Sequence, residues 1–130
     1  MYRAVTRDIE VTVEPTYCPD RSSPDQSAYF WTYTIEITNL GAETVQLLSR
    51  RWMIIDALGK RMEVAGPGVV GEQPTLGPSD SFRYTSGVPL ATASGMMSGA
   101  YEMITEDGER FEIDVPTFSL DTPEASRTLN

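Results

Sequence analysis

Residues 29–38 read YFWTYTIEIT, and this stretch decides the fold. Every odd position from Tyr29 to Ile37 is aromatic or isoleucine, and every even position from Thr32 to Thr38 is threonine or glutamate. A period of two places the first set on one face of a β-strand and the second set on the other. The stretch therefore predicts a long strand with one buried face. Phe30 is the exception, because it is a large apolar residue on the polar face.

Working outward, the same alternation recurs along the chain, and helical periodicity is nearly absent. Its phase breaks before Trp52–Ile55, which indicates a bulge near Ser49–Arg50 or cover on both faces of that strand. Further alternating segments lie at 9–13, 45–47, 62–64, 82–84, 101–103 and 111–115. We expect Met62 and Val64 to point inward.

Turn residues separate these segments. We expect loops at 18–26, 66–79 and 87–99, and a tight hairpin at Asp107-Gly108. The prediction is one all-β domain over residues 1–127, with about seven strands in an antiparallel β-sandwich of immunoglobulin or fibronectin type III kind. From about residue 119 the chain is polar, and we expect a flexible tail.

Composition excludes several classes of function. Ten basic against nineteen acidic residues give a net charge of −9, which opposes binding to nucleic acid or to an anionic membrane. The chain has no histidine, so Ser-His-Asp and Cys-His catalysis are excluded. Its single cysteine, Cys18, forms no internal disulfide and fits a reducing compartment. No apolar run reaches the roughly 20 residues of a spanning helix. We expect a cytoplasmic protein that is not an enzyme.

Residues 66–71 read GPGVVG and match the GxGxxG string of dinucleotide-binding loops. That site needs a helix directly after the glycines, but Pro74 and Pro78 break any such helix. Pro67 also lacks an N–H, and Glu72 places a negative charge beside the last glycine. Two interpretations remain for the residues in this loop. They supply positive φ at a strand crossover, or their amides form a nest for a small anion. The glycines concerned are Gly66, Gly68 and Gly71.

Three longer segments read GPGVVGEQP at 66–74, FRYTSG at 82–87 and GMMSGAYEM at 95–103. Together these segments resemble the ApaG family. Supporting matches lie at 47–56 and 111–120, so the resemblance covers residues 3–120. The chain departs from the usual pattern at Arg51, where many relatives have histidine, at Ala93 in place of proline, and at Ser79 in place of glycine.

The resemblance implies a fibronectin type III-like β-sandwich without an established enzymatic activity. One bacterial branch of the family is linked to cobalt resistance and magnesium efflux. Related domains are appended to eukaryotic F-box and DNA polymerase delta-interacting proteins, a context that favours protein binding. Because Arg51 replaces histidine, any mechanism that needs an imidazole there does not transfer.

Other candidate residues have ordinary interpretations. Carboxylates gather around the last hairpin, where they form a hard-cation site or, as their alternation favours, a solvated outer face. The hypothesis we favour is a protein-interaction module that presents Phe30 and Ile104 to a partner. The alternative is a sensor that binds a nucleotide polyphosphate or a divalent metal at residues 66–71. Neither hypothesis assigns a catalytic residue, a metal ligand or a cofactor.

Overall fold

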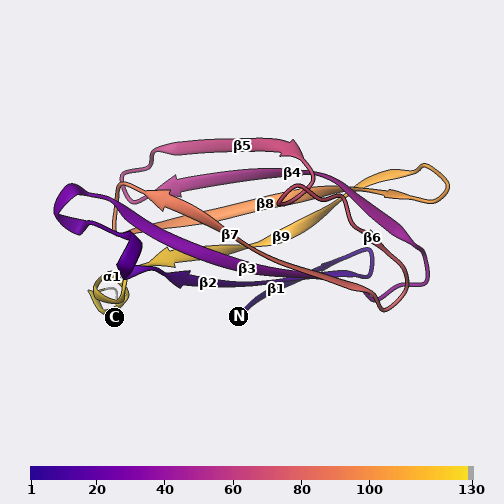
Figure 1. Cartoon of the computed structure of the whole chain (residues 1–130), viewed down its shortest axis with the longest axis horizontal. Helices are drawn as coiled ribbons and strands as arrows, with labels where there is room; N and C mark the ends of the chain where they lie inside the picture. The colour runs from indigo at the N-terminus through magenta and orange to yellow at the C-terminus, as the bar shows by residue number, and fades with distance from the viewer. Residues whose placement is uncertain (129–130) are drawn as a thin grey trace.

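A computed structural model describes residues 1–128 and shows two antiparallel β-sheets packed face to face (Figure 1). One sheet has the strand order β1-β2-β3-β7, and the other has the order β5-β4-β8-β9, with β6 paired to β4. The strands are β1 (Tyr2–Thr6), β2 (Ile9–Tyr17), β3 (Tyr29–Asn39), β4 (Val45–Asp56), β5 (Arg61–Pro67), β6 (Thr75–Leu76), β7 (Ser81–Leu90), β8 (Ser94–Thr105) and β9 (Arg110–Asp121). Two 3-10 turns (Pro19–Arg21 and Pro24–Gln26) and α1 (Pro123–Thr128) complete the elements of the described chain. The predicted antiparallel β-sandwich is confirmed.

The core lies between the sheets. From Trp31 to Ile37 the odd residues of β3 are at most 5% exposed, as their alternation predicts. They meet an aromatic cluster from the second sheet, where the ring of Trp52 lies 5.5 Å from Tyr33 and 6.3 Å from Phe118, both edge-on. Pairs of this geometry add about 0.5–1.5 kcal/mol to the stabilisation from area burial. Trp52 of β4 therefore contacts aromatic rings of both sheets.

A bulge in β4 explains the break in alternation. The register between β4 and β8 shifts between Leu47 and Ser49, so one residue of β4 has no partner on β8. Odd residues such as Leu47 face inward before the bulge, and even residues such as Trp52 and Ile54 face inward after it. Arg50 shares the parity of Trp52, so its side chain points toward the space between the sheets.

The first strand was not predicted from the sequence. β1 forms a hairpin with β2, and the turn residues Arg7 and Asp8 adopt positive φ values of 49° and 62°. Such turns usually carry Asn-Gly or Asp-Gly, and neither dipeptide stands here. The sequence therefore gives no local signal for this turn. Residues 2–6 form a strand because they pair with β2.

The prediction of a loop over residues 87–99 is wrong. β7 continues to Leu90 and β8 begins at Ser94, so the connection spans only 91–93. Gly87 and Pro89 suggest a turn, but they lie in β7, the last strand of its sheet, where proline is tolerated. Gly95 and Gly99 lie within β8, where the close approach of β4 requires glycine. A Cβ at these positions would lie 2.7 and 2.5 Å, respectively, from a carbonyl oxygen of β4.

The chain also stays structured beyond residue 119, where the sequence predicts the tail to begin. β9 continues to Asp121, Leu120 is fully buried, and α1 follows. The indole of Trp31 donates a hydrogen bond to the carbonyl of Asp121 at 3.0 Å. Residues 129–130 of the predicted tail lie outside the described residues.

One open side of the sandwich is closed by β1 and β9. The amide of Asp114 donates to Thr6 Oγ1, and the amide of Ser119 donates to the Tyr2 hydroxyl, both at 3.2 Å. The ring of Tyr2 also lies 6.1 Å from that of Phe118. Side chains of β1 thus bond to backbone amides of β9 and join the two sheets along this side.

Arg7 joins three turns at one end of the sandwich. Its guanidinium donates two hydrogen bonds of 3.0 Å to the carboxylate of Glu109 and lies 3.5 Å from that of Glu43. It also lies over the ring of Phe111, 4.1 Å from the centroid. The hydrogen bond from Arg7 and its charge lower the pKa of the Glu109 carboxyl.

This contact predicts a pH-dependent stabilisation. Because the pKa of Glu109 is lowered on folding, its contribution is complete above the ordinary value of 4.5 and is lost as the pH falls through the lowered value. Glu109→Gln should lower the thermal midpoint at neutral pH, and the difference from the parent should vanish in acid. Glu106→Gln, on the same hairpin, is the matched control. Equal effects of the two variants at neutral pH would contradict the assignment.

Candidate functional site

The glycines of residues 66–71 shape a tight connection between β5 and β6. Gly68 is buried with φ of 62°, and a Cβ there would collide with the carbonyl oxygen of Glu72. Val70 and Gly71 have φ of 43° and 81° and form a two-residue turn closed by two hydrogen bonds between Val69 and Glu72. The next element is the short strand β6, so the GxGxxG string is not followed directly by a helix. Gly68 and Gly71 therefore have a conformational role.

Three amides in and beside this loop are occupied by backbone carbonyl groups. Gly68 donates to the carbonyl of Leu48 at 2.8 Å, and Val69 and Glu72 donate to each other at 2.8 and 2.9 Å. An anion held by the amides of Gly68 and Val69 would have to displace these bonds, so the loop alone offers few donors. The loop instead points carbonyl groups toward the space between the sheets, where they accept hydrogen bonds from Arg50.

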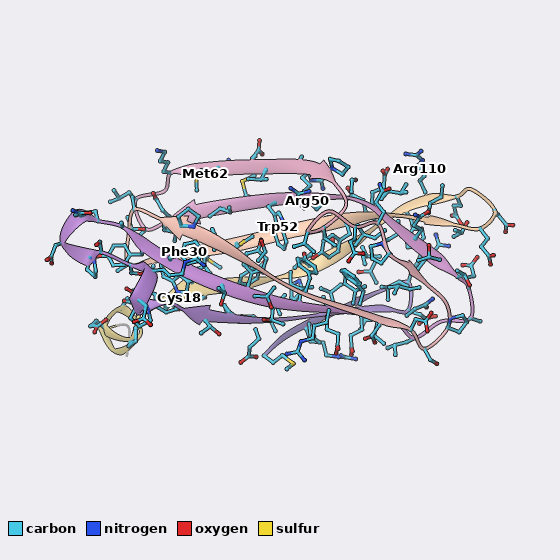
Figure 2. All side chains as sticks on the ribbon, viewed as in Figure 1. Cys18, Phe30, Arg50, Trp52, Met62 and Arg110 are labelled. Atoms are coloured by element: carbon cyan, nitrogen blue, oxygen red, sulfur yellow. The ribbon has the colours of Figure 1, made fainter. Side chains whose placement is uncertain are left out.

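Arg50 is the residue that donates to these loop carbonyl groups. It lies opposite Gly66 in the β4–β5 ladder, and its Nη1 donates to the carbonyls of Pro67 and Gly68 at 3.0 and 3.1 Å. A Cβ on Gly66 would lie 3.1 Å from the same nitrogen, so glycine leaves room for the guanidinium. Figure 2 shows Arg50 on β4 close to Trp52. In the sequence, Arg50 stands out only through the expected bulge near Ser49–Arg50, and nothing there marks it as a binding residue.

A cavity of about 190 Å³ opens beside the guanidinium of Arg50. The turn at residues 69–71 forms part of its wall, and β7 contributes Tyr84 and Ser86. Its other lining residues are Tyr33, Arg50 and Trp52. The cavity therefore combines one guanidinium with three hydroxyl groups.

The tyrosines around this cavity stay protonated. Tyr84 and Tyr101 share a buried hydrogen bond of 2.5 Å between their hydroxyl groups. Burial raises the pKa of both phenols, and it also raises the pKa of Tyr33, which the hydrogen bond with Ser86 and the charge of Arg50 oppose. At neutral pH all three are neutral hydroxyl groups, and the shared bond uses the proton of either Tyr84 or Tyr101.

The two residues proposed to face a partner lie on opposite faces of the sandwich. Phe30 is on the outer face of the first sheet, where its ring packs on Gly87 and under the guanidinium of Arg21, 3.9 Å from the ring centroid. Ile104 is on the outer face of the second sheet, and it is half-buried. They cannot form one continuous surface.

Two of the exposed apolar side chains, Met62 and Val64, lie on β5. Met62 and Val64 lie opposite Ile54 and Trp52 in the ladder, and thus on the inward side as predicted, yet they are 38% and 42% exposed. Figures 1 and 2 show β5, with Met62, at the margin of the molecule. Across the outer face of this sheet runs an open hollow of about 650 Å³, floored by the small residues 98–100 and bordered by Arg61 and Glu63. Alternation identified the inward side of β5 but could not show that it is uncovered.

The remaining candidates have structural roles. Glu112 pairs with Arg51 at 2.9 Å and Glu102 lies 3.5 Å from Arg110, so acidic residues of the last hairpin bind the chain's own arginines. Cys18 is half-buried and forms no disulfide within the described chain. Residues 1–128 contain no cluster of three or more side chains suited to hold a metal ion. No described helix has the length and apolar character needed to cross a membrane.

Comparison with known proteins identifies the family. The profile of the ApaG domain matches residues 19–105. Protein ApaG of Bradyrhizobium diazoefficiens is 68% identical, and that of Brucella anthropi is 61% identical, each over the full length of both chains. A crystal structure of the putative ApaA protein from Bordetella pertussis superposes with a TM-score of 0.87 at 45% identity, covering 89% of this chain and 94% of that one. The chain belongs to the ApaG domain family.

Proposed function

We propose that this protein is a non-catalytic cytoplasmic interaction module that binds an extended segment of a partner protein along the free edge of β5. The observation that carries the proposal is the state of this strand. β5 has seven residues, ends its sheet, and leaves its inward apolar side chains Met62 and Val64 partly exposed. Natural proteins usually cover, shorten or charge such an edge, because it can pair with another chain.

The hydrogen-bond pattern determines which groups of β5 are available. Gly68 N donates to Leu48 O at 2.8 Å, and Asp56 N donates to Lys60 O at 3.0 Å, in the same register as the ladder between them. In an antiparallel pair, hydrogen-bonded positions alternate, so even residues of β5 bond to β4. The backbone groups that face the free edge belong to Arg61, Glu63 and Ala65.

The other terminal strands carry features that hinder strand addition. Two amides of β9 bond to side chains of β1, which joins the sheets along that side. β7 contains Pro89, which has no N–H to offer a partner strand. Pro67 likewise ends β5, at an odd position where its missing N–H removes no bond to β4. The pairing surface is therefore confined to residues 61–65.

The chemistry of β5 specifies the partner. Arg61 and Glu63 carry opposite charges on the outer face, and Met62 and Val64 are apolar on the inner face. A complementary strand places an acidic residue opposite Arg61, a basic residue opposite Glu63, and apolar residues between them. β5 itself fits this pattern when a second copy pairs Arg61 with Glu63, so self-association must be distinguished from partner binding.

Hydrogen exchange tests the accessibility of this edge. In the dilute free protein, the amides of Arg61, Glu63 and Ala65 should exchange fast, and those of Met62 and Val64 slowly, because only the latter bond to β4. Exchange followed by NMR checks this directly. Uniform protection that disappears on dilution would identify a second copy as the occupant. Uniform protection at every concentration would contradict a free edge.

A peptide selection tests strand addition. Peptides selected against the purified protein from a random phage-displayed library should share the alternating pattern, and they should protect the amides of residues 61, 63 and 65. Ala65→Pro should weaken the selected peptide about tenfold or more, because it removes an edge donor without touching the β4 ladder. Ala65→Ser keeps the amide and is the matched control. Peptides whose binding is unchanged by Ala65→Pro would refute strand addition.

A further inference from the structure

We propose that the cavity beside Arg50 is a binding site for a small oxyanion of phosphate or carboxylate type, held by the guanidinium and by hydroxyl groups of the two facing sheets. This inference is independent of strand addition at β5. It rests on the position of one arginine, on its unused donors, and on the polar groups that surround the adjacent space.

Arg50 carries a charge in a position that the fold otherwise fills with apolar residues. It has the inward parity of Trp52 and Ile54, and its side chain is half-buried. Its direct hydrogen-bond acceptors are two neutral carbonyl groups, and no described carboxylate lies within 4.0 Å of it. A partly buried charge without a counter-ion is unfavourable, so a bound anion would stabilise this arrangement. Its neighbour Arg51, by contrast, faces outward and pairs with Glu112.

The guanidinium has donors left to bind a ligand. Nη1 contacts both loop carbonyls, whereas Nη2 and Nε have no acceptor among the described residues. Two N–H groups on one edge of a guanidinium match the spacing of two oxygens on a carboxylate or phosphate. Because the loop fixes Nη1, the guanidinium is held in place before any ligand arrives.

Hydroxyl groups complete the site. Tyr33, Tyr84 and Ser86 line the same cavity as Arg50. Their phenols stay protonated at neutral pH, so they add neutral donors without adding negative charge. Trp52 and Val69 supply apolar walls, which weaken competition from water.

The size of the cavity limits the ligand. A volume of about 190 Å³ holds one phosphate or a short carboxylate and a few waters, and it does not enclose a dinucleotide. A longer ligand would extend past Val70 into solvent, since that residue is 55% exposed. The site therefore recognises a terminal charged group.

An NMR titration tests this site. Sodium phosphate and sodium acetate are added in separate experiments, with sodium chloride at matched ionic strength as the reference, while the Arg50 Nε–H and the amides of Val70 and Gly71 are followed. We expect saturation in the millimolar range with at least one of the two anions and none with chloride. Saturation by phosphate alone or by acetate alone identifies which type of group the site takes.

Variants decide whether Arg50 is the ligand-binding group. Arg50→Met should weaken the binding about tenfold or more, and Arg50→Lys should give an intermediate loss, because lysine keeps the charge but not the planar pair of donors. Arg51→Met, at the adjacent outward position, should leave the titration unchanged. If Arg50→Met does not fold, Ser86→Ala and Tyr33→Phe each remove one hydroxyl and should weaken binding several-fold. Linear shifts with both anions, or saturation that persists in these variants, would overturn the proposal.

Discussion

The bulge between Leu47 and Ser49 is the constraint on which the rest of the structure depends. A bulge inserts one residue, so every later side chain of the strand moves to the opposite face. In β4 this places Trp52 in the core and Arg51 on the surface. Without it, the charged Arg51 would point into the sandwich and the indole of Trp52 would lie in water. β5 pairs only with the part of β4 after the bulge, so its own inward and outward residues follow from the same shift.

The glycine-rich loop and the inward-pointing Arg50 fit each other. Gly66 leaves room for the guanidinium, and the carbonyls of Pro67 and Gly68 accept its hydrogen bonds. In a phosphate-binding loop the amides point at the ligand, whereas here the carbonyl groups point at a cation of the same chain. The resemblance of residues 66–71 to a nucleotide motif is therefore misleading about the loop itself. The carbonyl groups of the loop orient Arg50, the residue to which we assign the proposed anion site.

Sequence reasoning succeeded where the determining interactions are local or periodic. Alternation identified the core face of β3 and the change of phase in β4, and the prolines ruled out a helix after the glycines. It failed where tertiary contacts override local signals, as at Gly87, which reads as a turn but lies under the ring of Phe30. The exposure of Met62 depends on how far the opposite sheet extends, and the isolation of Arg50 depends on which carboxylates approach it. Neither can be derived from spacing along the chain.

A sandwich of two sheets has two open sides, and this protein closes them differently. On one side, Tyr2 and Thr6 bond to amides of β9 and join the sheets. On the other side, the turn at residues 69–71 and β7 line a cavity, and the edge of β5 stays free. Ala65, the last edge donor of β5, directly precedes Gly66, which contacts Arg50. An anion that uses Nη2 and Nε leaves the bonds from Nη1 to the loop in place, so it would hold the end of β5 more firmly without covering its edge. A partner strand and a bound anion are therefore compatible, and each would favour the same position of β5.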